Sequence, residues 1–273
     1  MNTKKMILVT GSTGTFGSAL LNNIQEKQLN NKAVSLDDFD WNKPQTFEKA
    51  LEGIEKVFLI SPPNFADFDR KVIPFIEEAK KAGVKFILLS TLFGTDKNSE
   101  GTFGKTEKIV VESGIKHTII RPNFIFQNFI NYDIEAIKSG SIYLPTKDSK
   151  TSYIDVNDVA NASAIILENP EKHFNKAYTL TGSEALSHKV FAEIFSDVLG
   201  KEVVNIAPSN EEYKNTLISY NLPQDLVDFM GSLYAGIEAD FFTSTTNDYE
   251  LITGTKPTTA KEFIELNRSV FID

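Results

Sequence analysis

The stretch ILVTGSTGTFGSALL, from Ile7 to Leu21, constrains the fold more than any other part of the chain. A short apolar run leads into glycines spaced Gly11-x-x-Gly14-x-x-Gly17, and a helical pattern follows at once. This strand–turn–helix order is the context in which such glycines bind the phosphates of a nucleotide. We expect Gly11 to permit the tight turn, Gly14 to let a pyrophosphate approach, and Gly17 to let the helix pack on the strand.

The first turn of the expected helix supplies the rest of this nucleotide site. Unpaired N–H groups and a partial positive charge favour an anion at a helix N-terminus. The predicted cofactor-binding residues of the turn are Gly11, Ser12, Thr13, Gly14, Thr15, Phe16 and Gly17. The alternative is a glycine-rich turn that binds no ligand.

Short apolar runs alternate with helical patterns through the first half of the chain. The runs lie at 6–9, 57–60, 86–90 and 118–121, and the helices are expected near 15–29, 44–52, 66–81 and 104–113. Continuous apolar runs are typical of strands that are covered on both faces, as in a parallel sheet. The rhythm therefore favours an α/β fold with a Rossmann-type doubly wound sheet, and the alternation makes a bound nucleotide the better interpretation of the glycine turn.

The rhythm loosens after Pro122. Helices are expected near 156–168, 187–199, 210–220, 223–236 and 258–267, and short strands near 151–154, 177–181 and 203–206. We interpret residues 1–125 as the dinucleotide-binding domain and residues 126–273 as a smaller C-terminal α+β lobe, interleaved with the end of the sheet. Ser187 is expected to cap one of these helices and the pair Thr259 and Glu262 another, and Asp155 and Asp158 are also interpreted as helix-capping residues.

Composition excludes several classes of function. The chain has no cysteine and only three histidines, so disulfides, thiolate chemistry and a histidine-rich metal site are not expected. A net charge of −9 disfavours nucleic acid as a partner. The apolar run at the N-terminus is too short for a signal peptide or a membrane span, so we expect a cytoplasmic protein.

The segment from 30 to 44 bears on the identity of the dinucleotide. It leaves room for one strand, about Lys32 to Leu36, with no arginine after it. Asp37 and Asp40 could accept hydrogen bonds from the adenosine ribose and would repel a 2′-phosphate, which favours NADH over NADPH. An acidic loop that caps the next helix remains the alternative.

Several further motifs follow in order: VFLISPPNF (57–65), SGIKHTIIRPNFIFQNF (113–129), YIDVNDVA (153–160), YTLTGSEALS (178–187) and TGTKPTTAKEFI (253–264). With GSTGTFG (11–17) they resemble the NmrA-like branch of the atypical short-chain dehydrogenases, above all its NAD(P)H quinone oxidoreductases and azoreductase-like members. The resemblance implies a Rossmann domain that holds NAD(P)H and a lobe that closes over the nicotinamide.

The resemblance also implies roles for individual residues. Ser61, Pro62 and Pro63 would pass beside the cofactor, Ser90 and Thr91 would lie near the nicotinamide, and Lys105, the one catalytic candidate, could reach the ribose. Asn123 and Phe124 would flank the nicotinamide pocket. Phe93, Phe126 and Asn128 are the candidates for contact with a planar acceptor.

One departure from ordinary short-chain dehydrogenases concerns the acid. Their Tyr-x-x-x-Lys pair is missing from the helix that carries Lys105, because the position four residues earlier is Gly101. A ketone needs a proton donor as it is reduced, whereas a quinone gives a stabilised phenolate that can take a proton from water. A planar acceptor would suit a pocket of phenylalanines, although each ring could equally be a core residue; the rings in question are Phe65, Phe93, Phe103, Phe124, Phe126 and Phe129.

The sequence thus favours an NAD(P)H-dependent oxidoreductase that transfers a hydride to a quinone-like or other planar electrophile. The alternative is a redox-sensing regulator that binds NAD(P) and acts through a protein partner. A nucleotide-sugar epimerase or reductase shares the fold but is disfavoured by the missing tyrosine–lysine pair.

Arg121 is expected to anchor the end of its strand.

Overall fold

The computed structural model describes residues 6–34, 38–62 and 66–272 of the chain, which packs as two compact units. The first, called here the sheet unit, comprises Met1–Pro122, Val156–Leu180 and Asp248–Thr255. The second unit comprises Asn123–Asp155, Thr181–Asn247 and Lys256–Asp273. Residues beyond 125 therefore contribute to the packing of the sheet unit, and the division of function between residues 125 and 126 stays a prediction.

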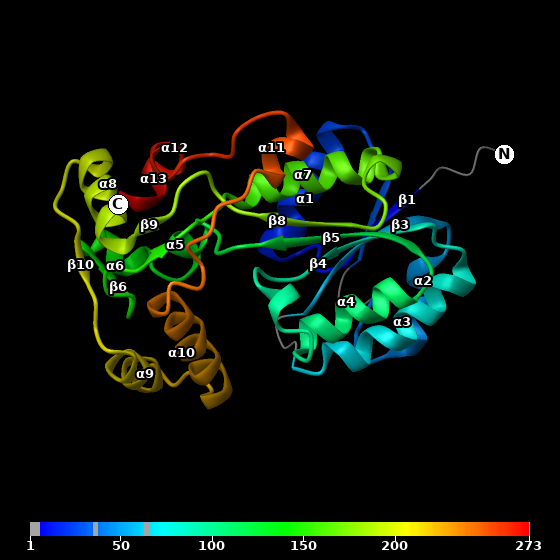
Figure 1. Cartoon of the computed structure of the whole chain (residues 1–273), viewed down its shortest axis with the longest axis horizontal. Coiled ribbons are helices and arrows are strands. Elements are labelled where there is room, and N and C mark those ends of the chain that lie inside the picture. The colour runs from blue at the N-terminus through cyan, green and yellow to red at the C-terminus, as the bar shows by residue number, and fades with distance from the viewer. Residues whose placement is uncertain (1–5, 35–37, 63–65, 273) are drawn as a thin grey trace. The chain divides into compact units, whose positions relative to one another are not determined.

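A six-stranded sheet forms the centre of the sheet unit, and every neighbouring pair of its strands is parallel. The strands are β1 (Met6–Val9), β2 (Asn31–Ala33), β3 (Ile54–Ile60), β4 (Phe86–Ser90), β5 (Lys116–Pro122) and β8 (Lys176–Leu180). Their order is β2-β1-β3-β4-β5-β8 (Figure 1). The sheet grows from β1 in both directions, so the predicted doubly wound Rossmann-type fold is confirmed.

Helices cover both faces of this sheet. On one face lie α1 (Thr15–Glu26), α7 (Val156–Glu168) and α11 (Asp248–Thr253), and on the other α2 (Phe47–Leu51), α3 (Phe68–Ala82) and α4 (Thr102–Glu112), as Figure 1 shows. Short 3₁₀ turns occur at Pro44–Thr46, Thr95–Lys97 and Pro170–Lys172. This two-sided cover explains why β4 reads FILLS and buries all five of its residues.

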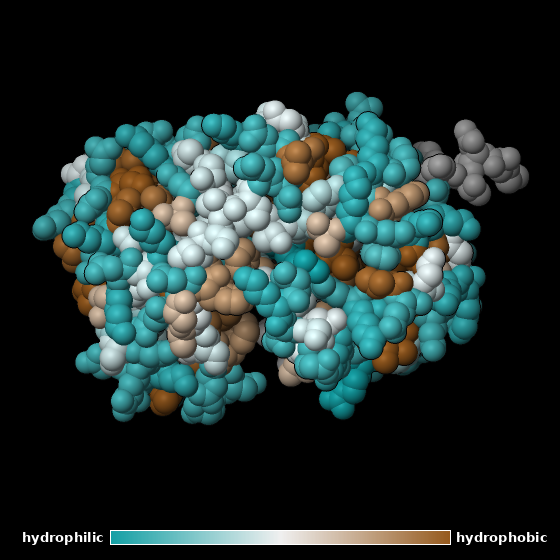
Figure 2. Space-filling view, viewed as in Figure 1, coloured by the Kyte–Doolittle hydropathy of each residue, from teal (hydrophilic) through white to brown (hydrophobic). Residues whose placement is uncertain are grey.

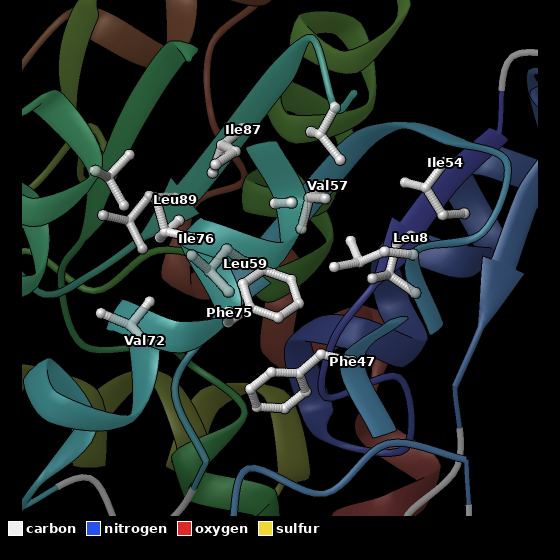
Figure 3. Close-up of a cluster of buried hydrophobic side chains, with 14 of the residues drawn as sticks. Leu8, Phe47, Ile54, Val57, Leu59, Val72, Phe75, Ile76, Ile87 and Leu89 are labelled. Carbon is white, nitrogen blue, oxygen red and sulfur yellow. The ribbon is translucent and has the colours of Figure 1, made fainter. Parts of the chain in front are cut away.

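The main core of the sheet unit fills the space between the strands and α2 and α3. Figure 3 shows Leu8, Val57 and Leu59 from the strands close to Phe47 and Phe75 from the helices. Both phenylalanines are almost completely buried, and their rings meet edge to face with centroids 5.5 Å apart. Burial of such side chains contributes about 1.5–3 kcal/mol each, so this cluster fixes how the two helices sit on the sheet.

The second strand is short and forms one edge of the sheet. The sequence predicts a strand over Lys32 to Leu36, whereas β2 spans Asn31–Ala33 and residues 35–37 lie outside the described part. After β2 the described chain continues into the 3₁₀ turn and α2. In the described residues no further strand lies beyond β2 in this sheet.

The second unit has the α+β composition expected of the C-terminal lobe. Its helices are α5 (Asn128–Asn131), α6 (Ile134–Lys138), α8 (His188–Leu199), α9 (Asn210–Ser219), α10 (Gln224–Glu238), α12 (Ala260–Leu266) and α13 (Arg268–Phe271). Strands β6 (Ser141–Tyr143) and β10 (Val204–Ile206) pair in parallel, and β7 (Lys150–Thr151) pairs antiparallel with β9 (Leu186–Ser187). An aromatic core joins several of these elements, and in it Phe129, Tyr153 and Phe191 lie within 5.3 Å of one another by ring centroids.

Two of the predicted helix caps are present in this unit. The hydroxyl of Ser187 accepts the Val190 N–H at the start of α8. Thr259 and Glu262 form a reciprocal capping box at the start of α12, in which the Glu262 carboxylate accepts the Thr259 N–H at 2.8 Å. Each cap satisfies N–H groups that the helix itself leaves unpaired.

The surface is mainly hydrophilic on the face drawn in Figure 2, where hydrophobic residues occur in small, separate groups. Among the described residues, no helix has both the length and the apolar character needed to cross a membrane.

Candidate functional site

The glycine turn between β1 and α1 is held by contacts that require two of its glycines. Gly11 has φ +62°, in the left-handed region, and its carbonyl oxygen accepts the Gly14 N–H at 3.0 Å. A Cβ on Gly17 would lie 2.1 Å from that same carbonyl oxygen, whereas a Cβ on Gly14 would lie at an ordinary 3.4 Å. The chain's own packing therefore explains Gly11 and Gly17 but not Gly14, whose expected role toward a ligand stays a prediction.

The first turn of α1 offers its N–H groups to an anion. Gly14 is the N-cap and makes no side-chain cap, and the turn contains no acidic residue. Thr13, Gly14 and Thr15 are exposed. A twelve-residue helix without a side-chain cap or an acidic residue in its first turn has the partial positive charge that favours an anion at its N-terminus, so the predicted phosphate site stays a prediction that this end of the helix is consistent with.

Ser12 serves a different purpose from its neighbours in the turn. It is buried, and its hydroxyl donates to the carbonyl of Val34 at 2.8 Å. Two residues before Ser12, the Thr10 hydroxyl accepts the Ile60 N–H at 2.9 Å. These bonds tie the turn to the ends of β2 and β3, so the Ser12 hydroxyl proton is directed to the protein rather than outward.

The acidic segment after β2 is only partly described, because Asp37 lies outside the described residues. Asp40 is engaged in its own turn: Oδ1 accepts the Asn42 N–H at 2.9 Å, and Oδ2 lies 3.2 Å from Lys43 Nζ. The Asn42 hydrogen bond and then Lys43 hold the pKa of Asp40 below its ordinary value. These contacts of Asp40 are all within its own loop, which favours the alternative interpretation of the segment as an acidic loop over a direct role for Asp40 at the adenosine ribose.

The ends of β3 and β4 carry the next predicted residues. Ser61 and Pro62 follow β3 and are half-buried, and Pro63 lies outside the described residues, as does Phe65. Ser90 ends β4 and Thr91 follows it, and each is 3% exposed. These positions lie at the carboxyl edge of the sheet, where open α/β sheets bind ligands.

A buried ion pair lies beneath Thr91. The Glu107 carboxylate on α4 accepts the Thr91 hydroxyl at 2.7 Å, Arg121 Nε at 2.9 Å and Arg121 Nη2 at 2.7 Å. The hydrogen bond to Glu107 raises the pKa of Arg121. Arg121 thus joins the end of β5 to α4, and its expected role as an anchor of the strand stays a prediction. Sequence reasoning missed Glu107, although its place on the face of α4 that Gly104 and Val110 also occupy was a usable signal.

Lys105 is exposed on α4, and its side chain has no hydrogen bond or ion pair to other described residues. Gly101, four residues earlier, is the N-cap of the helix. A Tyr-x-x-x-Lys spacing does occur elsewhere, at Tyr143 and Lys147, but on β6 and the loop after it. There Tyr143 Oη lies 3.4 Å from Thr216 Oγ1, and Lys147 Nζ pairs with Glu238 at 3.5 Å. That pair is not a counterpart of the helical one.

The predicted nicotinamide and acceptor residues of the second unit differ in availability. The Asn123 amide is fully engaged: Nδ2 donates to Ser152 Oγ at 2.8 Å and to the Phe242 carbonyl at 3.0 Å, and Oδ1 accepts the Phe124 N–H. Phe124 is half-buried, with its ring 5.6 Å from that of Tyr153.

The acceptor candidates likewise occupy different environments. Phe126 is 2% exposed and stacks on Phe263 in the aromatic core, as expected of a packing residue, and Phe129 is also in that core. Asn128 is half-buried at the start of α5. In the sheet unit, Phe93 and Phe103 are half-buried.

Comparison with known proteins places the chain in a family. The profile of the NmrA-like family matches residues 22–264. The chain belongs to the NmrA-like family. Among curated members, the NAD(P)H azoreductase of Xenophilus azovorans is 31% identical over 97% of this chain and 99% of its own.

Solved structures share the fold of this NmrA-like chain. An NADPH-dependent quinone oxidoreductase of Escherichia coli, complexed with NADPH, superposes with a TM-score of 0.85 at 24% identity, over 96% of this chain and 99% of that one. The triphenylmethane reductase of Citrobacter sp., complexed with NADP(H), gives a TM-score of 0.81 at 22% identity, with the same coverage.

Proposed function

We propose that this NmrA-like protein is an NAD(P)H-dependent oxidoreductase that transfers a hydride to a quinone-like or other planar electrophilic acceptor. The observation that carries the proposal is the N-terminus of α1, which has no side-chain cap and follows a glycine turn in which Thr13, Gly14 and Thr15 are exposed. The relatives named as azoreductase, quinone oxidoreductase and triphenylmethane reductase support the reaction class.

The dinucleotide would be held along the carboxyl edge of the sheet. The N–H groups at the start of α1 would bind the diphosphate, with Thr13 and Thr15 exposed beside them. Ser61 and Pro62 after β3 and the end of β4 would line the rest of the crevice. When bound, the reduced nicotinamide supplies the hydride.

The chain's own residues point to an acceptor that needs no strong acid. Gly101 stands where the tyrosine of ordinary short-chain dehydrogenases would be, and the Thr91 hydroxyl already gives its proton to Glu107. The protein would therefore act by holding a planar acceptor and the nicotinamide together away from water. Taken one by one, Phe93 of the sheet unit and Phe124 of the second unit are half-buried and so more available for contact with an acceptor than the buried Phe126.

The preference between the two coenzymes follows from the segment after β2. The absence of an arginine and the presence of Asp37 favour NADH. Asp40 adds little to this preference, because its carboxylate is bound to Asn42 and Lys43.

The test is a fluorescence titration of NADH and NADPH into the protein, followed by addition of a simple quinone. We expect binding of at least one coenzyme below millimolar concentration and oxidation of the bound coenzyme when quinone is present. Absence of binding at millimolar coenzyme contradicts the proposal. Selective binding of one redox form without turnover of quinones or dyes supports the regulator instead.

A further inference from the structure

Three donors converge on the Glu107 carboxylate in the sheet unit. Both groups of the ion pair are largely buried, with side chains 15% exposed for Arg121 and 10% for Glu107. Arg121 donates hydrogen bonds to both carboxylate oxygens through Nε and Nη2, and the Thr91 hydroxyl donates a further hydrogen bond to Oε1. Both oxygens of Glu107 thus act as acceptors in a charge-assisted, bidentate pair.

The ionised carboxylate fixes the direction of the Thr91 hydrogen bond. A carboxylate only accepts, and a threonine hydroxyl has one proton to give. The Thr91 proton therefore points to Glu107, and only oxygen lone pairs remain for any other partner. Thr91 can accept from a ligand and cannot donate to it.

We infer that Glu107 and Arg121 are positioning residues that hold Thr91 as a pure hydrogen-bond acceptor for a donor group of the bound dinucleotide. The inference rests on the proposed function, since it takes the carboxyl end of β4 as part of the dinucleotide site. The groups of a nicotinamide dinucleotide that can donate are its amide N–H groups and its ribose hydroxyls.

The ion pair is not needed to join the strands. The backbone ladder already continues past Ser90, because the Thr91 N–H donates to the Ile120 carbonyl at 2.9 Å and the Phe93 N–H to the Pro122 carbonyl at 2.9 Å. Burying two charges is costly and often no more stabilising than apolar packing of the same volume. A role in setting the Thr91 hydroxyl explains the pair better than a role in stability.

The local packing keeps Glu107 under Thr91. A Cβ on Gly104 would lie 2.3 Å from the Asn98 carbonyl oxygen, so α4 lies directly on the loop that follows β4. Gly104 and Glu107 are one helical turn apart and share that face. Unlike Thr91, Ser90 has a hydroxyl that makes no hydrogen bond to the described residues. Successive residues of an extended chain point to opposite faces, so Ser90 is not expected to face Glu107.

A double-mutant cycle tests the inference. Glu107→Gln removes the charge and one of the two acceptor oxygens, so Arg121 and Thr91 compete for the oxygen that remains and the Thr91 proton is no longer fixed on residue 107. The coenzyme used is NADH or NADPH, whichever binds the wild type more tightly. We expect Glu107→Gln to raise the Kd for this coenzyme at least about tenfold in the wild-type background. In the Thr91→Val background we expect the same substitution to change the Kd by less than about twofold. Equal losses in both backgrounds overturn the inference.

Two further variants keep the test decisive. Glu107→Gln in a Ser90→Ala background should retain its full effect, because Ser90 is not bound to Glu107. If Glu107→Gln fails to fold, Thr91→Ser must bind coenzyme as the wild type does and Thr91→Val must bind it weakly; similar binding by the two overturns the inference. Thermal unfolding measured without coenzyme shows whether each variant is folded. If the wild type binds coenzyme but the variants do not behave as expected, this inference fails while the proposed function stands; if the wild type does not bind, the proposed function itself fails.

Discussion

The Tyr153 hydroxyl lies 3.1 Å from Nε2 of His188, inside the second unit. The other ring nitrogen of His188 lies 2.9 Å from the Thr146 hydroxyl, and the imidazole is fully buried. Burial lowers the pKa of His188 to about 4. The ring is therefore neutral at physiological pH, with one nitrogen as donor and the other as acceptor.

We predict that the imidazole of His188 stays neutral down to about pH 5. In an NMR titration its imidazole should show no change between pH 7.5 and 5, with His188→Gln used to assign the signal. A midpoint near 6.5 for this residue would show that the buried arrangement is wrong.

Asp133 has the opposite perturbation in the same unit. Desolvation raises the pKa of Asp133 to about 7. Burial, and after it the charge of Asp133, raises the pKa of Tyr153 and Tyr234. Between about pH 4 and 7 the folded state keeps a proton that the unfolded state has lost, so stability falls as pH rises through this window. Asp133 is only half-buried by its exposed surface, so solvent screening limits the total effect to about 1–3 kcal/mol.

We predict that Asp133→Asn removes this loss. The variant should exceed the wild type in unfolding free energy at pH 8, and the difference should shrink toward pH 4. His188 acts in the other sense, because its lowered pKa makes stability fall as pH drops from 6.5 toward 4. In the wild type the opposite pH dependences of Asp133 and His188 offset each other. The unfolding free energy of Asp133→Asn should therefore fall more steeply below pH 6.5 than that of the wild type. Denaturant unfolding at pH 4, 5, 6.5 and 8 measures both; parallel curves for the two proteins would refute the assignment.

The glycine turn gives a prediction with a matched control. Gly17→Ala places a methyl group 2.1 Å from the Gly11 carbonyl oxygen, whereas Gly14→Ala meets it at 3.4 Å. We expect Gly17→Ala to lose several kcal/mol of stability and coenzyme binding together, since backbone must move. Gly14→Ala should keep wild-type thermal stability and lose coenzyme affinity alone. Equal thermal stability of the two variants would contradict this account.

Much of the fold could be predicted from the sequence because its signals are local. The continuous apolar run FILLS specifies a strand buried on both faces, and Gly83 specifies where α3 ends. The short β2 was harder, since three residues carry little periodicity. The return of residues 156–180 to the sheet unit depends on packing between distant segments, which no local pattern encodes.

The site could be predicted only in part, for a similar reason. The glycine spacing fixes the turn, so Gly11 and Gly17 have the contacts expected of them. The engagement of Asn123 with Ser152 and Phe242 joins residues far apart in sequence and could not be predicted. Glu107 looked like any charged helical residue, because only the fold brings it to Thr91 and Arg121.

The last prediction concerns Lys105, which we propose reaches the bound dinucleotide from α4. Its side chain is exposed and makes no ion pair with the described residues, so Lys105→Met should change the unfolding free energy by less than about 0.5 kcal/mol. Coenzyme affinity should fall about tenfold, which corresponds to about 1.4 kcal/mol of lost interaction. Lys108, three residues along the same helix and 3.9 Å from Glu112, provides the control. Lys108→Met should leave the Kd for coenzyme unchanged, and an equal loss in both variants would mean that the general charge of the helix, rather than Lys105, attracts the coenzyme.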